Sequence, residues 1–572
     1  MEKRLALAFL LTAVLIIVWQ RFLAPIPQPV RPGAQSAATA PASAAPAAAA
    51  AATPAGQPAT PPAQTVAVRS PLYEYRFSTR GAALTWAELL KYPSYVHRGE
   101  RVQLVPRGAA DVLTGTMVSA GRTLDLRAVQ FTPSAPRLEL KAGGPAQSLT
   151  FTGTQNGAPV AEVTYTFRPD DYTVDVRGRV LGGAAGTLYT SLGTGLAPHD
   201  AKEHGTAREL SFVAWNGRRV ERHYLKSITA GDTIAGPLAW AGIKDRYFLM
   251  ALVPQKTQFT RLVAAERPDE SYSVGGEPLV SPRAEGTVAL PVGADGAFAY
   301  QAYLGPLEHD RLVAVGHQLE EVNPYGYRWL RPVVRPIAAF VLWALRELHD
   351  NLGLAYGWVL VLFGVLVRLV TWPLNARAMR SQMKNMAVQP IMQERMKELQ
   401  KKYADDPRRQ QQEMMKMYQE LGVNPFSMMS GCLPMLIPMP VLITLFFVFQ
   451  GAIEFRGAGF AWLPDLSLRD PLYLLPILLV ASMFALQWIS TKMSGMADNP
   501  QAKTMMYTMP LMMGVFFWLM PSGLNLYYVS SNLASVPQQL LIARERRAAS
   551  EAAKAEQAAK AKPAGPAKAK RR

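Results

Sequence analysis

The sequence is poor in the residues and motifs that identify most enzymes and disulfide-bonded proteins. Its 572 residues include one cysteine, Cys432, so no disulfide can form within the chain. It has no G-x-x-x-x-G-K-[ST] loop, no H-E-x-x-H and no C-x-x-C. These absences argue against a P-loop ATPase, that class of zinc protease and a C-x-x-C redox or metal site. The sequence therefore predicts no catalytic residue, no metal site and no cofactor.

Acidic residues are missing from the long apolar runs of the C-terminal half, and basic residues outnumber acidic ones in the whole chain. Lys and Arg number 60 against 42 Asp and Glu, a formal net charge of +18. Such an excess indicates anionic partners, either phospholipid headgroups or nucleic acid. The apolar runs are long enough to be candidate membrane spans, and they cover residues 352–372, 433–450, 471–489, 505–520 and 522–542.

A further apolar run lies at the N-terminus. Lys3 and Arg4 precede uncharged residues 5–19, a length that suits either a cleaved signal peptide or a signal anchor. Because the apolar character resumes at Phe22, we favour an anchor over residues 1–24. Both alternatives export the segment that follows.

The next 300 residues read as a linker followed by a β-domain. Residues 25–65 are almost entirely Ala, Pro, Gly, Ser and Gln, which is typical of a mobile linker. Residues 66–325 contain short alternating runs separated by Gly, Pro, Asp and Asn, which predict a large β-sandwich. The clearest is a hairpin around "RPDD", with one face made by Val163, Tyr165 and Phe167 and the next by Tyr172, Val174 and Val176.

Residues 326–350 and 351–545 are predicted to be associated with the membrane. The first stretch mixes Arg and Trp with apolar residues and is expected to be an interfacial helix, broken at Pro332 and Pro336. The second contains the five apolar runs and a basic, Met-rich hairpin at residues 375–424.

Basic residues predict the orientation of these spans. Ten lysines and arginines lie in the hairpin and more in the tail 546–572, whereas the loops on the opposite side have few. The positive-inside rule then places the hairpin and the tail in the cytoplasm and the β-domain in the periplasm. With the first span retained, the chain crosses the membrane six times and both termini are cytoplasmic.

Several polar residues interrupt the apolar runs, and two interpretations stay open. Intramembrane polar groups generally face a bundle interior or a water-filled cavity, which predicts a polar hollow open to the cytoplasm. Alternatively, single Thr and Gln residues serve helix packing, and Arg368, only five residues from Pro373, extends to the headgroups. The residues concerned are Arg368, Gln487, Thr491, Thr504, Thr508, Asn525, Tyr528 and Asn532.

Three other charged stretches allow functional and structural interpretations. "PHDAKEH" places His199 and His204 around two carboxylates, but we expect solvated loop histidines and not a metal or catalytic site. The hairpin either packs on itself or on lipid, or helps to bind a partner. The tail from Ala543 carries ten basic and three acidic residues, so it either binds an anionic surface such as ribosomal RNA or only aids solubility.

Four stretches then identify a resemblance. They are "VRLVTWPLNARAMRSQMKNMAVQP", "MYQELGVNPFSMMSGCLPMLIPMPVLITLFF", "DPLYLLPILLVASMFALQ" and "MPSGLNLYYVSSNL". In this order they resemble the YidC family of bacterial membrane-protein insertases over about residues 351–545. The layout of the exported part is similar to that of Gram-negative members.

The resemblance implies a fold, a function and a site. It implies a periplasmic β-supersandwich and five core spans around a hydrophilic groove, in which Arg368 and the tyrosine pair Tyr527 and Tyr528 lie. It also implies nascent membrane proteins, the ribosome and the Sec translocon as partners. The sequence departs from relatives at Gly364, where some have a hydroxyl residue, and at Pro438, where a polar residue is usual.

The sequence as a whole predicts a polytopic α-helical membrane protein, with six spans including a five-span insertase core, and a periplasmic all-β supersandwich domain. The predicted function is a non-enzymatic insertase and chaperone for inner-membrane proteins. A transporter or channel is the alternative, although the sequence has no inverted repeat and no carboxylate within a span. Sugar chemistry in the β-domain is a third possibility, without visible catalytic residues.

Overall fold

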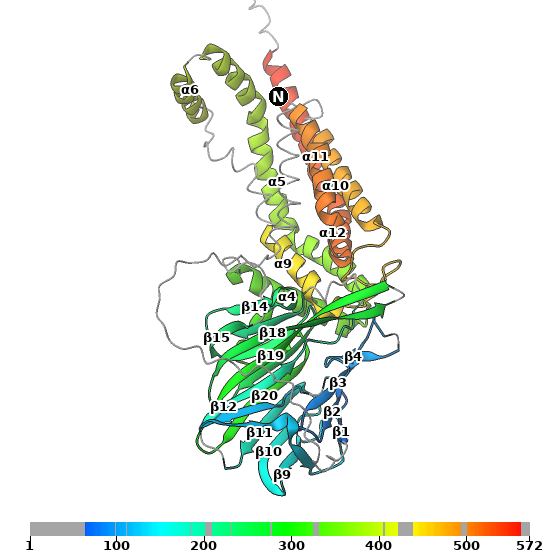
Figure 1. Ribbon diagram of the computed structural model, residues 1–572. Helices are drawn as coiled ribbons and strands as arrows, with labels where there is room; N and C mark the ends of the chain where they lie inside the picture. Colours follow the sequence, from blue (N-terminus) through cyan, green and yellow to red (C-terminus); the bar gives the residue numbers. More distant parts are fainter. Residues whose placement is uncertain are drawn as a thin grey trace, which may run out of the picture. The chain divides into compact units, whose positions relative to one another are not determined.

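A computed structural model (Figure 1) describes residues 63–561 except 98, 110, 183–184, 201–208, 230, 275–276, 324–330, 404–405, 421–438 and 494–499. The predicted anchor at 1–24, nearly all of the linker at 25–65, Pro438 and the last part of the tail lie outside the described residues.

Residues 65–322 form strands and a few short helices. The strands are β1 (Thr65–Arg69), β2 (Tyr73–Ser78), β3 (Leu84–Pro93), β4 (Arg101–Gln103), β5 (Gly115–Ser119), β6 (Arg122–Asp125), β7 (Gln130–Pro133), β8 (Arg137–Glu139), β9 (Gln147–Gln155), β10 (Ala158–Phe167), β11 (Thr173–Val180), β12 (Gly186–Gly193), β13 (Ser211–Trp215), β14 (Val220–Tyr224), β15 (Asp232–Leu238), β16 (Trp240–Lys244), β17 (Phe248–Pro254), β18 (Phe259–Val274), β19 (Glu277–Val292) and β20 (Ala297–Pro306). The short helices are η1 (Leu126–Ala128), η3 (Leu225–Ser227), α3 (His309–Val315) and η4 (Leu319–Val322).

These strands make three sheets. A five-stranded sheet has the order β4-β3-β2-β1-β8, a nine-stranded sheet the order β14-β13-β16-β17-β20-β11-β10-β9-β7, and a six-stranded sheet the order β15-β18-β19-β12-β5-β6. The β1–β8 pair is parallel, and the neighbours of β10 and β18 are antiparallel. The inner faces of the sheets share one continuous apolar core.

The hairpin predicted around "RPDD" is confirmed. Strands β10 and β11 pair in antiparallel register, with Phe167 opposite Val174 and Tyr165 opposite Val176. The alternating apolar residues on both strands are buried. The ring of Tyr165 lies 4.6 Å from that of Phe77 on β2, centroid to centroid. Alternation at period two therefore placed these side chains correctly, because successive residues of a strand point to opposite faces.

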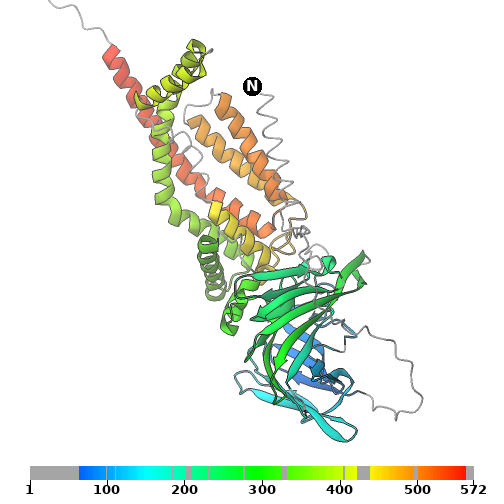
Figure 2. The same cartoon turned by 60° about the vertical axis from the view of Figure 1, so that its left-hand side comes forward.

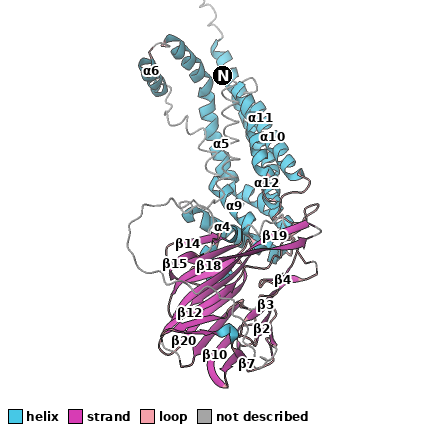
Figure 3. Cartoon of the chain, viewed as in Figure 1, coloured by secondary structure: helices cyan, strands magenta, loops and turns pink. Residues whose placement is uncertain are grey.

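The C-terminal half is helical. Its elements are α4 (Arg331–Leu352), α5 (Tyr356–Lys402), α6 (Pro407–Glu420), α9 (Met439–Gly451), η5 (Ile453–Phe455), α10 (Leu474–Met493), α11 (Pro500–Trp518) and α12 (Ser522–Ala561). Helix α12 packs against α5 and α10, α10 packs against α11, and α4 packs against α9. Figures 2 and 3 show the strands and the long helices as separate groups, with α10 and α11 side by side.

Helix α4 corrects one prediction. The stretch was expected to break at Pro332 and Pro336, but a continuous helix runs from Arg331 to Leu352. Pro332 lies in the first turn, where no backbone N–H has an intrahelical partner. Pro336 lies in the second turn and removes one hydrogen bond, which the remaining four turns tolerate. Both prolines are therefore compatible with one helix.

Two described helical segments are long and apolar enough to cross a membrane, namely Tyr356–Pro373 of α5 and Leu474–Lys492 of α10. Val441–Gly451 and Met506–Trp518 are apolar but shorter. The predicted run 522–542 forms the first half of α12, and three residues separate α12 from the end of α11, as the "MPSG" turn indicated. The count of six crossings stays a prediction.

Candidate functional site

The predicted polar residues lie on four helices, and two of those helices, α5 and α12, approach closely at Gly364 on α5. A Cβ atom added to Gly364 would lie 2.9 Å from the carbonyl oxygen of Tyr527 and 3.3 Å from Cβ of Ser530, both on α12. Only glycine lets two helix backbones come this close without displacement. A glycine at position 364 therefore has a packing reason.

Arg368 lies one turn after Gly364 on the same side of α5. Its side chain is half-buried, and its guanidinium interacts electrostatically with Tyr527. The buried Nε atom has no hydrogen-bond partner among the described residues, and no described carboxylate forms an ion pair with Arg368. The guanidinium is thus partly removed from solvent without a protein counter-charge in the described part of the chain.

Tyr527 and Tyr528 are both largely buried, but they face different neighbours. The ring of Tyr527 lies 5.8 Å from that of Phe363 on α5 and 6.5 Å from that of Phe449 on α9. The ring of Tyr528 lies 5.0 Å from that of Phe517 on α11. The tyrosine pair therefore links α12 to helices on both of its sides.

Polar side chains of α12 hydrogen-bond to neighbouring helices at three levels. Nδ2 of Asn525 donates to the carbonyl of Phe517 at the end of α11 (3.1 Å), and its buried Oδ1 has no partner among the described residues. Nδ2 of Asn532 donates to Oγ of Ser482 on α10 (2.9 Å). Nε2 of Gln538 donates to the carbonyl of Trp372 on α5 (3.0 Å). Asn525 thus caps α11, while Asn532 and Gln538 join helices.

The remaining candidates lie on α10 and α11. Oγ1 of Thr508 donates to the carbonyl of Thr504 (2.7 Å), one turn earlier on its own helix. Thr491 is buried near the end of α10, and Gln487, one turn before it, is half-buried. The described contacts bring Gly364, one turn before Arg368, against Tyr527, and they join Asn532 to Ser482. They do not connect Arg368 with Gln487 or Thr508.

Sequence reasoning missed Ser482 and Gln538. Gln538 follows Asn525, Tyr528 and Asn532 on α12 and is fully buried. Gln538 lies six residues after Asn532, and not three, four or seven as residues on one helix face do. The search for polar residues on one face therefore did not include it. A search for every amide within an apolar run would have found it.

Comparison with known proteins decides the family. Residues 65–340 match the family model described as YidC periplasmic domain, and residues 347–550 match that described as 60Kd inner membrane protein. The chain is 30% identical over 575 residues to a membrane protein insertase YidC of Syntrophus aciditrophicus, covering 95% of this chain and 100% of that protein. The chain belongs to the YidC family.

Other YidC proteins match over similar lengths. The insertase of Chlorobium phaeovibrioides is 31% identical and covers 95% of both chains, and that of Ralstonia nicotianae is 32% identical and covers 84% of this chain and 83% of its own. A crystal structure of an active YidC insertase covers 84% of this chain and 94% of that chain, at 19% identity and a TM-score of 0.32.

Membership of the YidC family confirms the coarse predictions. The family consists of non-enzymatic insertases of the inner membrane that act on nascent membrane proteins, and its periplasmic domain is mostly β-sheet here. The three-sheet region at 65–306 and the helical region after residue 331 correspond to the two matched family models.

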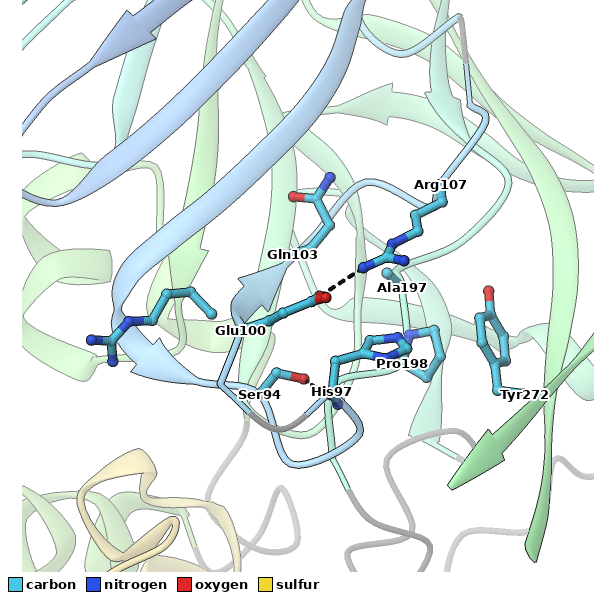
Figure 4. Close-up of a pocket in the computed structure, with 9 residues that line it drawn as sticks. Ser94, His97, Glu100, Gln103, Arg107, Ala197, Pro198 and Tyr272 are labelled. Carbon is cyan, nitrogen blue, oxygen red and sulfur yellow. Dashed lines mark hydrogen bonds and ion pairs between the residues drawn. The ribbon is translucent and has the colours of Figure 1, made fainter. Parts of the chain in front are cut away.

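The periplasmic domain of this YidC protein has a small polar pocket (Figure 4). Among its lining residues, Arg107 and Glu100 form an ion pair at 2.7 Å, and Nε2 of Gln103 is buried without a partner among the described residues. Its volume of about 20 Å³ accommodates one or two waters. The described residues hold no cluster of three His, Cys, Asp or Glu side chains suited to a metal ion.

The interpretation of His199 as a solvated loop residue was wrong. His199 and Asp200 are both buried, and Asp200 forms an ion pair with Arg456 from the segment between α9 and α10. Sequence reasoning treated "PHDAKEH" by itself, and the partner of Asp200 lies 256 residues further along the chain. No local pattern could reveal this contact.

Proposed function

We propose that the chain inserts membrane proteins by receiving the hydrophilic flank of a nascent chain in a groove that Arg368 lines. The observation that carries this proposal is the half-buried guanidinium without a carboxylate partner among the described residues. An arginine at the centre of a span costs about 2.5–3.5 kcal/mol on translocon scales, and Arg368, five residues before the end of the Tyr356–Pro373 segment, bears part of that cost. Water and a passing acidic side chain would both lower that cost.

Several neighbours support a wet site at this level of the bundle. Tyr527 packs against Gly364, one turn before Arg368, and its neighbour Tyr528 faces α11. We assign the groove lining to Arg368, Gln487, Thr508, Asn525, Tyr527, Tyr528 and Asn532. The groove shortens the path of the flank through dry lipid, while burial of the passenger's apolar segment in the bilayer supplies the driving force.

We also propose the topology and the partners. Six crossings, with the anchor at 1–24, place both termini in the cytoplasm and residues 25–350 in the periplasm. Exposed Trp358 and Trp518 lie at the ends of α5 and α11, and exposed Trp462 lies between α9 and α10. This topology places all three at the outer surface, where tryptophan is enriched. The basic hairpin and tail would contact ribosomal RNA and anionic phospholipids, and the core would also act beside the Sec translocon as a chaperone.

The test is an insertion assay on passengers whose translocated flanks carry graded negative charge. A charge in a confined hollow of low dielectric acts more strongly than one in water. Attraction of an acidic flank needs only a positive charge and not the two-point hydrogen bonding of a guanidinium. We therefore expect Arg368→Lys to be close to the native protein. Arg368→Ala should lose about tenfold with acidic flanks and little with neutral ones, and Arg368→Glu should be worst.

The control is Leu369→Ala, which removes an exposed apolar side chain at the adjacent position and should leave all passengers unaffected. Equal insertion by the Ala and Lys variants on every passenger would refute the groove role. Arg368 would then be an arginine that extends to the lipid headgroups.

A further inference from the structure

The segment between α9 and α10, residues 452–470, contacts the β-domain on one side and α12 on the other. Toward α12, the carbonyl oxygens of Leu468 and Leu466 accept hydrogen bonds from the backbone N–H groups of Ser522 (2.6 Å) and Gly523 (2.9 Å). These two donors belong to the first turn of α12, where N–H groups have no intrahelical partner. The segment therefore caps the helix that carries the tyrosine pair of the proposed groove.

The buried carboxylate of Asp465 holds the segment together. Its Oδ2 accepts from the backbone N–H of Gly457 (2.8 Å), and its Oδ1 accepts from the backbone N–H (2.7 Å) and Oγ (2.6 Å) of Ser467. The backbone carbonyl of Asp465 accepts from Oγ of Ser522 (3.2 Å). A buried carboxylate that loses such donors is left partly unsatisfied, which is costly. Asp465 thus connects the residue after Arg456 to the first residue of α12.

Toward the β-domain, Arg456 enters a buried site. Its Nε and Nη2 atoms lie 2.7 and 2.6 Å from Oδ1 of Asp200, and the two side chains are 1% and 0% exposed. The guanidinium also lies over the rings of Tyr95 (4.6 Å) and Phe248 (5.3 Å). A Cβ atom at Gly457 would lie 1.5 Å from the hydroxyl oxygen of Tyr95, so glycine allows this close approach. Removing one partner of a buried pair leaves an uncompensated charge and is strongly destabilising.

Two hydrogen bonds from the turn between β16 and β17 reach the segment and its flank. The hydroxyl of Tyr247 donates to Oγ of Ser467 (3.0 Å), the same oxygen that donates to Asp465. Nε of Arg246 donates to the carbonyl of Gln450 at the end of α9 (2.7 Å). The β-domain therefore contacts the segment near both of its ends.

These contacts form one continuous chain between the β-domain and α12. Energetic coupling between separate elements is carried by packed side chains and hydrogen bonds that have no gap between them. Here the chain runs from Asp200 to Arg456, through the adjacent Gly457 to Asp465, and from there to Ser522. A change in the β-domain at Asp200 can therefore reach the first turn of α12.

We propose that Asp200 is a positioning residue for the insertase core. Through Arg456 and residues 452–470 it fixes the first turn of α12 to the β-domain, and the segment and this turn open as one unit. The β-domain would thereby limit the movement of the helix that carries the tyrosine pair. The consequence for a passenger rests on the groove proposed above, whereas the docking of the segment does not.

Hydrogen–deuterium exchange of the full-length protein in lipid nanodiscs tests the positioning role. Exchange is followed in peptides covering residues 456–468 and 520–526. Asp200→Asn keeps the size of the side chain and leaves Arg456 buried without its counter-charge. We expect both peptides to exchange about a hundredfold faster than in the native protein, which corresponds to about 3 kcal/mol of lost docking free energy.

Tyr247→Phe is a milder second variant. It removes only the hydroxyl that donates to Ser467, so both peptides should exchange about fivefold faster. Protection of the β10 amides reports whether each variant remains folded. Tyr247→Phe decides the question if Asp200→Asn does not fold.

Two matched controls alter contacts within the β-domain. Asp175→Asn removes the carboxylate that pairs with Arg168. Tyr300→Phe removes a buried hydroxyl that donates to the carbonyl of Leu113 (3.1 Å). Neither contact involves the segment, so residues 520–526 should exchange at the native rate in both controls.

The proposal is overturned if residues 520–526 keep the native exchange rate in the folded Asp200→Asn and Tyr247→Phe variants, even where residues 456–468 become faster. It is also overturned if the controls accelerate residues 520–526 as much, because a general loss of β-domain stability would then be the cause. Each result can be obtained whether or not Arg368 lines a groove, so the two proposals fail separately.

Discussion

The β-domain and the helical region follow opposite rules for their apolar side chains. In the β-domain, large apolar residues are buried in one core, and few of them are exposed, such as Val118 and Val280. On the helices, many large apolar residues are exposed, among them Trp358, Leu511 and Leu533. Exposed apolar surface of this extent marks an interaction site in a soluble protein. On helices long enough to span a bilayer it indicates contact with lipid.

Buried polar groups also differ between the β-domain and the helical region. Buried ionisable residues of the β-domain are paired, as His199 is with Asp245 and Asp200 is with Arg456 of the segment between α9 and α10. Between the helices the buried polar atoms are mainly amides and hydroxyls, and Arg368 has no counter-charge among the described residues. Buried charge is thus paired where the β-domain excludes water, and it lacks a described counter-charge on α5, where a passenger is proposed to bind.

The largest effect is expected from shortening a buried side chain in the core of the β-domain. The ring of Phe167 is fully buried and lies 5.8 Å from that of Phe77. Phe167→Ala should lower the free energy of unfolding by about 3–5 kcal/mol, measured by urea-dependent proteolysis of the detergent-solubilised protein. Phe340→Ala, on the exposed face of α4, should change it by less than about 0.5 kcal/mol. Equal midpoints for the two variants would contradict a difference between the regions.

A charge introduced at an exposed apolar position should show whether that position faces lipid or water. Leu511 lies midway along α11 and is 67% exposed, while Val280 on β19 is 53% exposed. Leu511→Lys should impose about 2.5–3.5 kcal/mol on membrane integration, visible as loss of the carbonate-resistant protein. Val280→Lys should have no measurable effect, since water solvates the ammonium there. If both variants integrate normally, α11 does not face lipid.

The smallest effect tests the contact between α5 and α12. Gly364→Ala brings a Cβ atom to 2.9 Å from the carbonyl of Tyr527, whereas a Cβ at Gly451 meets nothing within 4 Å. Overpacking at Gly364 should cost about 1–3 kcal/mol, measured as a lower midpoint of thermal unfolding in detergent. Gly451→Ala should be neutral or slightly stabilising, because alanine favours helix. A stabilising Gly364→Ala would show that the helices can separate freely.

The sequence alone determined the class of each region. Alternation at period two identified β10 and β11 and the faces that they bury, because the pleat leaves no other arrangement for such a pattern. Long apolar runs identified the helical region, and the family motifs identified the insertase class. Length and composition are sufficient for these conclusions, since burial in a core and burial in lipid both select apolar residues.

Tertiary structure alone decided which polar residues meet. Asp200 and Arg456 lie 256 positions apart, and a chain pattern contains no signal for an ion pair across that distance. In the same way, nothing in the sequence pattern around Gly364 indicates the close approach to the backbone of Tyr527 that the fold shows. Helix periodicity assigns a residue to a face, but only the packing of two elements determines what that face touches. The partners of His199 and Arg368 therefore depend on how the elements pack, which the sequence pattern does not reveal.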